Sequence, residues 1–146
     1  MSGEPDVVFV DSNVIIKHIA GDERARGFML EIEGNEFVGC VNQIVVSEVL
    51  FIYIKLKTGL RPLDLKRKPD LLRSLKLDDV FRIFELFQEL EGGALIRTLT
   101  EGVMEEYGLL PNDALIAATC RFYGIKKIAS FDEDFRRVDF LKVLRP

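Results

Sequence analysis

The stretch Val7-Val8-Phe9-Val10-Asp11-Ser12-Asn13 decides the fold, because it joins an apolar strand to a set of polar side chains. Four consecutive apolar residues, three of them β-branched, are typical of a strand that is buried on both faces of a sheet. Ligands of open α/β sheets bind at the carboxyl ends of the strands, and Asp11 follows this strand directly. Asp11, Ser12 and Asn13 are also good N-cap residues, so capping of a helix that starts at Val14 is the competing interpretation.

Apolar segments of strand length alternate with helical segments along the chain, which is typical of a parallel sheet wrapped by helices. Besides residues 7–10, the pattern predicts strands at 37–41, 94–97, 127–129 and 141–144. Apolar residues at helical spacing predict helices at 14–20, 22–33, 43–57, 78–90, 100–107 and 114–122, with residues 58–77 partly loop. No repeat or linker interrupts the pattern, so we predict one α/β domain over residues 1–146, with a central parallel sheet of four to five strands.

The composition restricts the chemistry that this chain can perform. No apolar run is long enough to span a bilayer, and residues 1–6 carry no signal segment, so we expect a cytoplasmic protein without a membrane partner. The two cysteines, Cys40 and Cys120, lie in apolar surroundings and are expected to be buried free thiols. The one histidine, His18, falls inside a predicted helix, which argues against a Ser-His-Asp or Cys-His enzyme. Any catalysis must therefore depend on carboxylates.

The net charge of −4 hides a strongly basic segment. Residues 55–76 hold eight basic and two acidic side chains, which makes this segment +6 and the remainder −10. A solvated face is the usual explanation of such a run, and a docking surface for an acidic partner peptide is another. A polyanion-binding surface is the functional alternative, and its candidate RNA contacts are Lys55, Lys57, Lys66, Arg67 and Lys68.

Two further carboxylates stand at unusual places on predicted helices. Glu48 interrupts an apolar helix face between Ile44 and Ile52, a costly position unless the carboxylate is paired or holds a metal. A boundary residue that reaches water or pairs with Lys55 is the alternative. Asp113 lies in the first turn of a very apolar helix, where the helix dipole favours a negative charge without any further function.

The segment Ser130-Phe131-Asp132 repeats, after a later strand, the arrangement found at Asp11. If the two strands are parallel neighbours, Asp11 and Asp132 emerge side by side, although Asp134 is equally eligible as the relevant carboxylate or as a helix cap. Four carboxylates at two strand ends, a helix start and a helix face suit Mg²⁺ or Mn²⁺, which take oxygen ligands. Such metals commonly serve phosphoryl chemistry.

At this point the sequence resembles the PIN-domain ribonucleases, and most of all the small stand-alone kind that serves as the VapC toxin of toxin–antitoxin pairs. Four motifs in this order carry the resemblance along nearly the whole chain: VVFVDSNVII around Asp11, NQIVVSEVL around Glu48, LLPNDALIAA around Asp113 and IASFDEDF around Asp132. The resemblance implies an α/β/α sandwich and an acidic pocket for one or two ions of Mg²⁺ or Mn²⁺. It also implies that metal-activated water hydrolyses RNA and leaves a 5′-phosphate.

The resemblance also assigns roles to individual residues. Asp11, Glu48, Asp113 and Asp132 match the family's acidic quartet, with Asp11 and Asp113 as the first direct metal ligands. The small polar residues that support such a pocket are matched by Ser12, Asn13 and Ser130. The implied partners are an RNA substrate, an antitoxin protein and a second copy of the chain.

Two other protein families are excluded by single residues. A haloacid-dehalogenase-type phosphatase needs a second aspartate where this chain has Asn13, and a receiver domain needs adjacent acids at the first strand end. Two related functions stay open: a PIN nuclease of RNA processing without an antitoxin, and a non-catalytic PIN-fold module that binds RNA. The basic connection before Asp78 is longer than in compact toxins, which keeps the processing nuclease in consideration.

Overall fold

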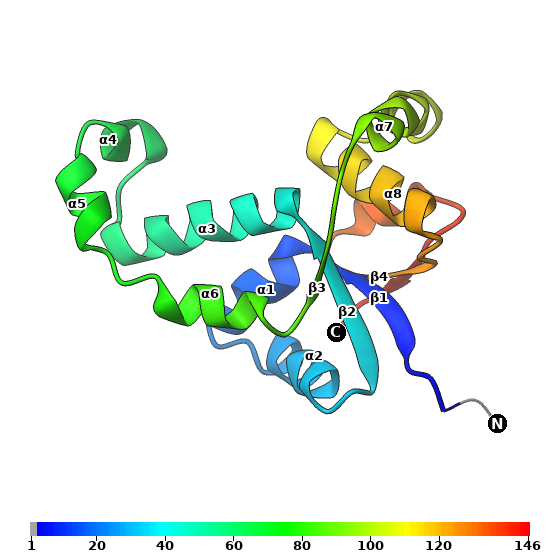
Figure 1. Ribbon diagram of the computed structural model, residues 1–146, viewed down its shortest axis with the longest axis horizontal. Helices are drawn as coiled ribbons and strands as arrows, with labels where there is room; N and C mark the ends of the chain where they lie inside the picture. The colour runs from blue at the N-terminus through cyan, green and yellow to red at the C-terminus, as the bar shows by residue number, and fades with distance from the viewer. Residues whose placement is uncertain (1–2) are drawn as a thin grey trace.

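The computed structural model describes residues 3–146, so the first two residues of the predicted domain lie outside it. Its centre is a five-stranded sheet in which all pairings are parallel, in the order β3-β2-β1-β4-β5 (Figure 1). The strands are β1 (Asp6–Val10), β2 (Phe37–Asn42), β3 (Gln88–Leu90), β4 (Lys127–Ala129) and β5 (Lys142–Leu144). The predicted α/β class and the parallel sheet are confirmed.

Helices cover both faces of the sheet. They are α1 (Ser12–Ile19), α2 (Glu23–Glu33), α3 (Gln43–Thr58), α4 (Pro62–Lys66), α5 (Pro69–Ser74), α6 (Asp78–Phe84), α7 (Ala94–Tyr107) and α8 (Pro111–Tyr123), with a short 3-10 helix η1 (Glu133–Arg137) before β5. The chain moves outward from β1 to β2 to β3 and then returns to β4 on the other side of β1. Because crossovers between parallel strands are right-handed, this reversal puts α1 and α2 on one face and α7 and α8 on the other, as Figure 1 shows.

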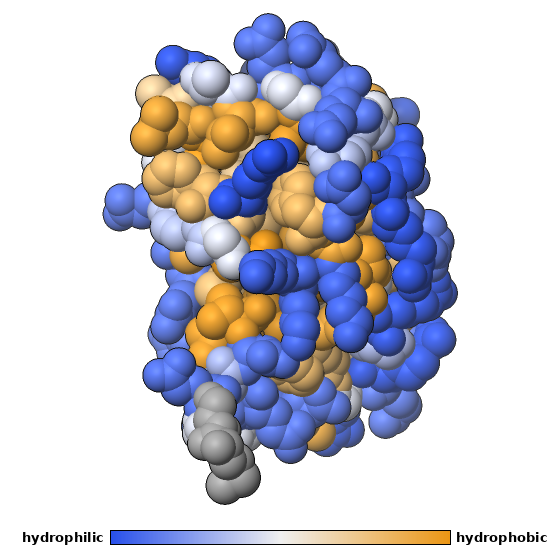
Figure 2. Space-filling view, turned by 90° about the vertical axis from the view of Figure 1, so that its right-hand side faces the viewer, coloured by the Kyte–Doolittle hydropathy of each residue, from blue (hydrophilic) through white to orange (hydrophobic). Residues whose placement is uncertain are grey.

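The buried strand predicted at the start of the chain is the centre of the core. Val8, Phe9 and Val10 have no exposed surface, and β1 pairs with β2 on one side and β4 on the other. Helix α8 packs its apolar side against the sheet, with Ile116 and Ala117 fully buried. Figure 2 shows the side of the molecule on which α7 and α8 lie, and there exposed apolar surface lies between charged side chains. The centre of the sheet is therefore buried under the helices on both sides.

Gly39 of β2 is required by close packing. A Cβ at this position would lie 2.8 Å from a ring carbon of Phe87 and 3.1 Å from Cδ1 of Ile32. Both neighbours are buried, Phe87 just before β3 and Ile32 on α2. Glycine thus lets the loop before β3 and helix α2 approach the same point of the sheet.

Two predicted elements are wrong. Residues 94–97 were expected as the third strand, but they form the first turn of α7, and the helix expected at 100–107 is the second half of α7. The helix expected over 78–90 ends at Phe84, and the third strand is Gln88–Leu90. The first error arises because a short apolar run such as Ala94-Leu95-Ile96 fits a strand and a helix equally well. The second arises because Gln88-Glu89-Leu90 is polar and lacks the apolar pattern of a strand.

The segment between α3 and α6 extends away from the sheet. Helix α3 runs outward from the end of β2, and α4 and α5 lie at its outer end (Figure 1). We call α4, α5 and the outer half of α3, residues 51–74, the arm. Both cysteines are buried and free, as predicted. Between residues 3 and 146, no helix has the length and apolar character required to cross a membrane.

Candidate metal centre

The candidate site lies where the order of strands reverses, between the carboxyl ends of β1 and β4. These strands are parallel neighbours, with Phe9 beside Ile128 and Val10 beside Ala129. The backbone N–H of Asp11 continues the ladder by donating to the Ala129 carbonyl at 3.0 Å. This is the arrangement under which the sequence places Asp11 beside the residues that follow β4. It is also the usual place for a ligand in an open parallel sheet.

Asp11 is only 4% exposed, and donors from its own chain surround its carboxylate. Oδ1 accepts a hydrogen bond from the Ser12 N–H at 2.8 Å, so Asp11 itself caps α1. Oδ2 accepts one from the Ser130 hydroxyl at 2.7 Å and one from Asn13 Nδ2 at 3.2 Å. Burial raises the pKa of Asp11 to about 6 despite the hydrogen bonds, and the charges of Glu48 and Asp132 add to the rise.

The three residues predicted to support the pocket connect the two strand ends. Asn13 Nδ2 also donates to Ser130 Oγ at 3.2 Å, and Asn13 Oδ1 accepts the backbone N–H of Phe131 at 3.1 Å. Ser130 Oγ in turn accepts the backbone N–H of Asp132 at 2.9 Å. This network holds the chain after β4 against the chain after β1, and it thereby fixes the position of the Asp132 backbone.

Three carboxylates converge beside this network. Asp113 in the first turn of α8, Asp132 at the N-cap of η1 and Asp134 each offer an oxygen, and these oxygens all lie within 4.8 Å of one another. The pKa of the half-buried Asp113 is raised to about 6, mainly by burial. Smaller contributions to this rise come from the charges of the neighbouring carboxylates, Asp11, Asp132, Glu48 and Asp134. Asp134 is exposed and pairs with Arg137 at 3.2 Å. The sequence offered Asp132 and Asp134 as alternatives, and the structure brings both to the site.

Glu48 approaches the site from α3. Its Oε2 accepts a hydrogen bond from Asn112 Nδ2 at 3.3 Å, and its charge acts on both Asp11 and Asp113. No ion pair within residues 3–146 joins it to Lys55, the alternative partner. The sequence gives Asn112 no role of its own, although it lies within the motif LLPNDALIAA. The signal for it is its place directly before Asp113, on the same helix turn.

The donor set suits a small hard cation. All the converging groups are carboxylates, which are the ligands of Mg²⁺ and Mn²⁺, and they lie close enough to repel one another. Burial, and to a smaller extent the charge of neighbouring carboxylates, raises the pKa of Asp11 and of Asp113. A divalent cation held by Asp113, Asp132 and Asp134 would relieve the repulsion. The residues present therefore fit the predicted metal.

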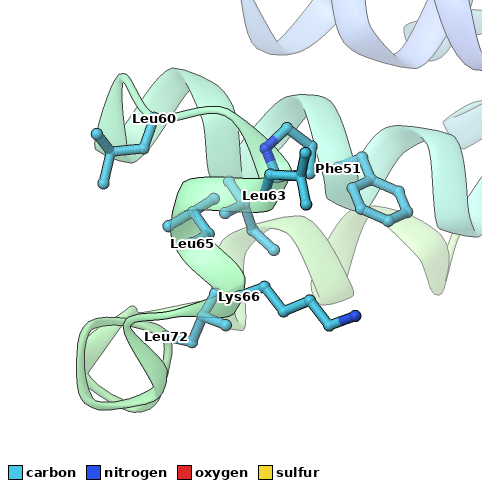
Figure 3. Close-up of a pocket in the computed structure, with 8 residues that line it drawn as sticks. Phe51, Leu60, Leu63, Leu65, Lys66 and Leu72 are labelled. Atoms are coloured by element: carbon cyan, nitrogen blue, oxygen red, sulfur yellow. The ribbon is translucent and has the colours of Figure 1, made fainter.

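The basic segment has a different position. Lys66 borders a cavity of about 430 Å³ on the arm, whose other lining residues are apolar and include Phe51, Leu63 and Leu72 (Figure 3). Lys55 and Arg67 line a neighbouring cavity of about 630 Å³. Lys57 lies 5.4 Å from the Tyr53 ring centroid, and Lys68 precedes α5. In the described part of the chain, no hydrogen bond or ion pair joins these five cations to the converging carboxylates.

Comparison with known proteins gives consistent matches along the chain. The model of the PIN domain family matches residues 8–141. Ribonuclease VapC2 of Methanocaldococcus jannaschii is 46% identical over 141 residues, which cover 97% of this chain and 95% of that protein. Ribonuclease VapC6 of the same organism is 34% identical over 151 residues, 97% of this chain and 98% of that protein.

The solved structures that resemble this one share its fold. A chain of a toxin-antitoxin complex from Klebsiella pneumoniae superposes with a TM-score of 0.64 and 17% sequence identity, covering 94% of this chain and 96% of that one. Identity at this level speaks for the arrangement of strands and helices alone.

Proposed function

Because this chain belongs to the PIN-domain family, we propose that it is a ribonuclease that hydrolyses RNA phosphodiester bonds with Mg²⁺ or Mn²⁺. The observation that carries the proposal is the convergence of Asp113, Asp132 and Asp134 beside the buried Asp11. Two relatives that match over nearly their whole length bear the name ribonuclease, which supports the same activity.

The proposed roles follow from the contacts of each side chain. Asp113, Asp132 and Asp134 would hold the cation, with Glu48 and Asp11 adding negative charge around it. Bound there, a divalent cation would supply a nucleophilic water and stabilise the charge that develops on the phosphate oxygens. Ser12, Asn13 and Ser130 hold the Asp11 carboxylate, and Asn112 orients Glu48. Arg137 pairs with Asp134 and limits the repulsion among the acids.

The finer proposal is that this nuclease is the toxin of a VapBC-type pair in the cytoplasm. The names of both relatives support the toxin assignment. The arm has a surface to which an antitoxin could bind. Its apolar cavity of about 430 Å³ has Lys66 at the border, and Phe51 and Leu63 beside it are 56% and 73% exposed. An acidic amphipathic segment of an antitoxin would cover this surface. The alternatives to this function are a processing nuclease without an antitoxin and a non-catalytic RNA-binding module. The other proposed partner is a second copy of the chain.

The first prediction tests the activity. The purified protein should cleave structured RNA in Mg²⁺ or Mn²⁺ and stop in EDTA, and Asp113→Asn should lower the rate by about a hundredfold or more, because the amide removes a ligand charge. Asp79→Asn is the matched control, since Asp79 is an exposed aspartate in the first turn of another helix, α6. Circular dichroism establishes that both variants are folded. A folded Asp113→Asn variant that cleaves at the parent rate would overturn the assignment of the site.

A further inference from the structure

Three cationic side chains from separate parts of the chain gather around the ring of Phe131. Lys17 Nζ lies 5.0 Å from the ring centroid, the Arg24 guanidinium carbon 5.6 Å and the Arg145 guanidinium carbon 5.7 Å. We propose that these four residues, the Phe131 cluster, bind phosphate groups of the RNA beside the carboxylates. This inference rests on the proposed ribonuclease function and names the surface by which the substrate is held.

The position of the Phe131 cluster ties it to the site. Phe131 stands between Ser130 and Asp132, and its backbone N–H donates to Asn13 Oδ1 at 3.1 Å. Lys17 is four residues after Asn13 on α1, which puts the two side chains on one face of the helix with Cβ atoms about 6 Å apart. The network that holds the backbone of Asp132 therefore also holds that of Phe131, the residue around which the three cations gather.

The charges in the cluster leave room for an anion. Arg24 pairs with Asp22 at 3.6 Å and Arg145 with Glu133 at 2.9 Å, but both arginine side chains are about half or more exposed, at 61% and 47%. Exposed ion pairs are weak and are screened by salt. Lys17 has no ion pair among residues 3–146. Three like charges around one ring repel each other. A bound phosphate would attract all three and so offset this repulsion.

An aromatic ring is suited to hold such a group of cations in place. Its face attracts cations through the ring quadrupole, so Phe131 holds the three side chains without neutralising them. Arginine presents a planar fork of donors that matches phosphate oxygens, and lysine adds a compact charge. Phe131 thus fixes where the positive charge lies, while the ion pairs of Arg24 and Arg145 are exposed and can be exchanged for a phosphate.

The carboxylates make a cluster of this kind necessary. A pocket of four or five acids repels the phosphates of RNA, so the strand needs positive charge close to the pocket but outside it. The arm, whose cations were predicted to serve this purpose, lies at the outer end of α3 (Figure 1). An acidic peptide is the other ligand for cations. It is less suited to the Phe131 cluster, because the large apolar cavity that would anchor a peptide lies on the arm.

The second prediction tests the cluster by the salt dependence of RNA binding. The probe is a short, dye-labelled single-stranded RNA of mixed sequence, and binding is followed by fluorescence anisotropy from low to moderate salt. Each phosphate contact contributes about 0.7 to the slope of log affinity against log salt, so replacing Lys17, Arg24 and Arg145 with glutamine should flatten the slope by about 2. The KM for RNA cleavage should rise by a larger factor than kcat falls.

Three further variants make the test specific. Lys76, Arg82 and Lys126 are exposed and have no ion pair within the described chain, so their replacement by glutamine removes the same charge and should leave the slope unchanged. Lys17→Gln alone breaks no ion pair and should flatten the slope by about 0.7, which keeps the test valid if the triple variant unfolds. Phe131→Leu keeps an apolar side chain but loses the ring, and it should raise the KM.

The outcomes separate the inference from the function. Binding is measured without cleavage, so a parent protein that binds RNA but never cuts it would refute the ribonuclease and still leave the cluster testable. A cluster variant with the parent slope would refute the cluster. So would a slope that flattens only when Lys66, Arg67 and Lys68 are replaced, because the RNA would then run over the arm. Loss of antitoxin binding with unchanged RNA binding would assign the cluster to a peptide instead.

Discussion

Asp11 shows at the scale of one residue why the site needs a carboxylate at its base. Three donors point at its two oxygens: the Ser12 N–H, the Ser130 hydroxyl and the Asn13 amide. A carboxylate only accepts hydrogen bonds, whereas an asparagine would place its own N–H₂ against one of these donors. Substitution of Asp11 by asparagine should therefore disturb the fold as well as the charge. Asp113, which has no such set of donors, is the cleaner position for a charge-removing variant.

The third prediction is that the metal-free protein loses stability as the pH rises from about 4.5 to 7. The pKa of Asp11 is about 6 in the folded protein against an ordinary value of 3.8, so the folded state binds more protons than the unfolded chain between these values. Ionisation of Asp11 should then cost roughly 3 kcal/mol of unfolding free energy by pH 7. Asp113 adds a smaller amount, because it is half-exposed. Burial lowers the pKa of His18 from 6.5, so His18 acts in the opposite direction within this range, whereas Asp22 and Glu133, whose pKa values are also lowered, change their contribution mainly below it.

Urea unfolding in EDTA at pH 4.5, 5.5 and 7 measures this effect. Asp113→Asn should have a shallower pH dependence than the parent, while the control Asp79→Asn should follow the parent. Stability that stays level or rises through this range in EDTA would mean that the two carboxylates are not under the strain that their burial predicts.

At the scale of the elements, the sequence predicts what depends on local pattern and fails where tertiary contacts decide. The strand at 127–129 is confirmed to the residue, and its position after a helix that ends at Gly124 is the local signal for it. β3 was missed because Gln88-Glu89-Leu90 is polar, and only its pairing with β2 makes it a strand. The convergence of Asp113, Asp132 and Asp134 could be anticipated from their positions at a helix start and after a strand, whereas the assignment of Asp11, Glu48, Asp113 and Asp132 as a metal-binding quartet stays a prediction. The hydrogen bond from Asn112 to Glu48 could not, since it joins two helices 64 residues apart.

The fourth prediction concerns the packing of β2. Gly39→Ala should destabilise the protein by about 1 to 3 kcal/mol, because the new methyl group meets the buried ring of Phe87 and Cδ1 of Ile32. Gly27→Ala is the control within the same molecule. Gly27 lies in α2 with open space where a Cβ would be added, so alanine there should stabilise the helix by about 0.5 to 1 kcal/mol. Chemical denaturation of both variants would show opposite signs; two equal shifts would contradict the packing argument.

At the scale of the whole molecule, the candidate metal centre depends on the fold. Its carboxylates come from the chain after β1, from α3, from α8 and from the chain after β4, so unfolding separates all of them. A cation that binds only the folded protein stabilises it by mass action. The metal is therefore expected to act on stability as well as on catalysis.

The fifth prediction measures that coupling by thermal unfolding. At a metal concentration a hundred times the Kd, the free energy of unfolding should rise by about 2.7 kcal/mol, and the Tm should rise with it. The double variant Glu48→Gln with Asp113→Asn should lose this response, whereas Asp79→Asn should keep it. A parent Tm that is the same in Mn²⁺ and in EDTA would count against a metal centre here.

The hydrogen bond between Ser130 and Asp11 spans 119 residues of sequence, and this has a consequence for synthesis on the ribosome. Chains are made from the N-terminus, and domains fold as their residues emerge. Asp11 leaves the exit tunnel 119 residues before its partner Ser130. A nascent chain or a prematurely terminated fragment thus lacks half of the centre. We therefore expect the proposed ribonuclease to be inactive until the residues after β4 have left the ribosome.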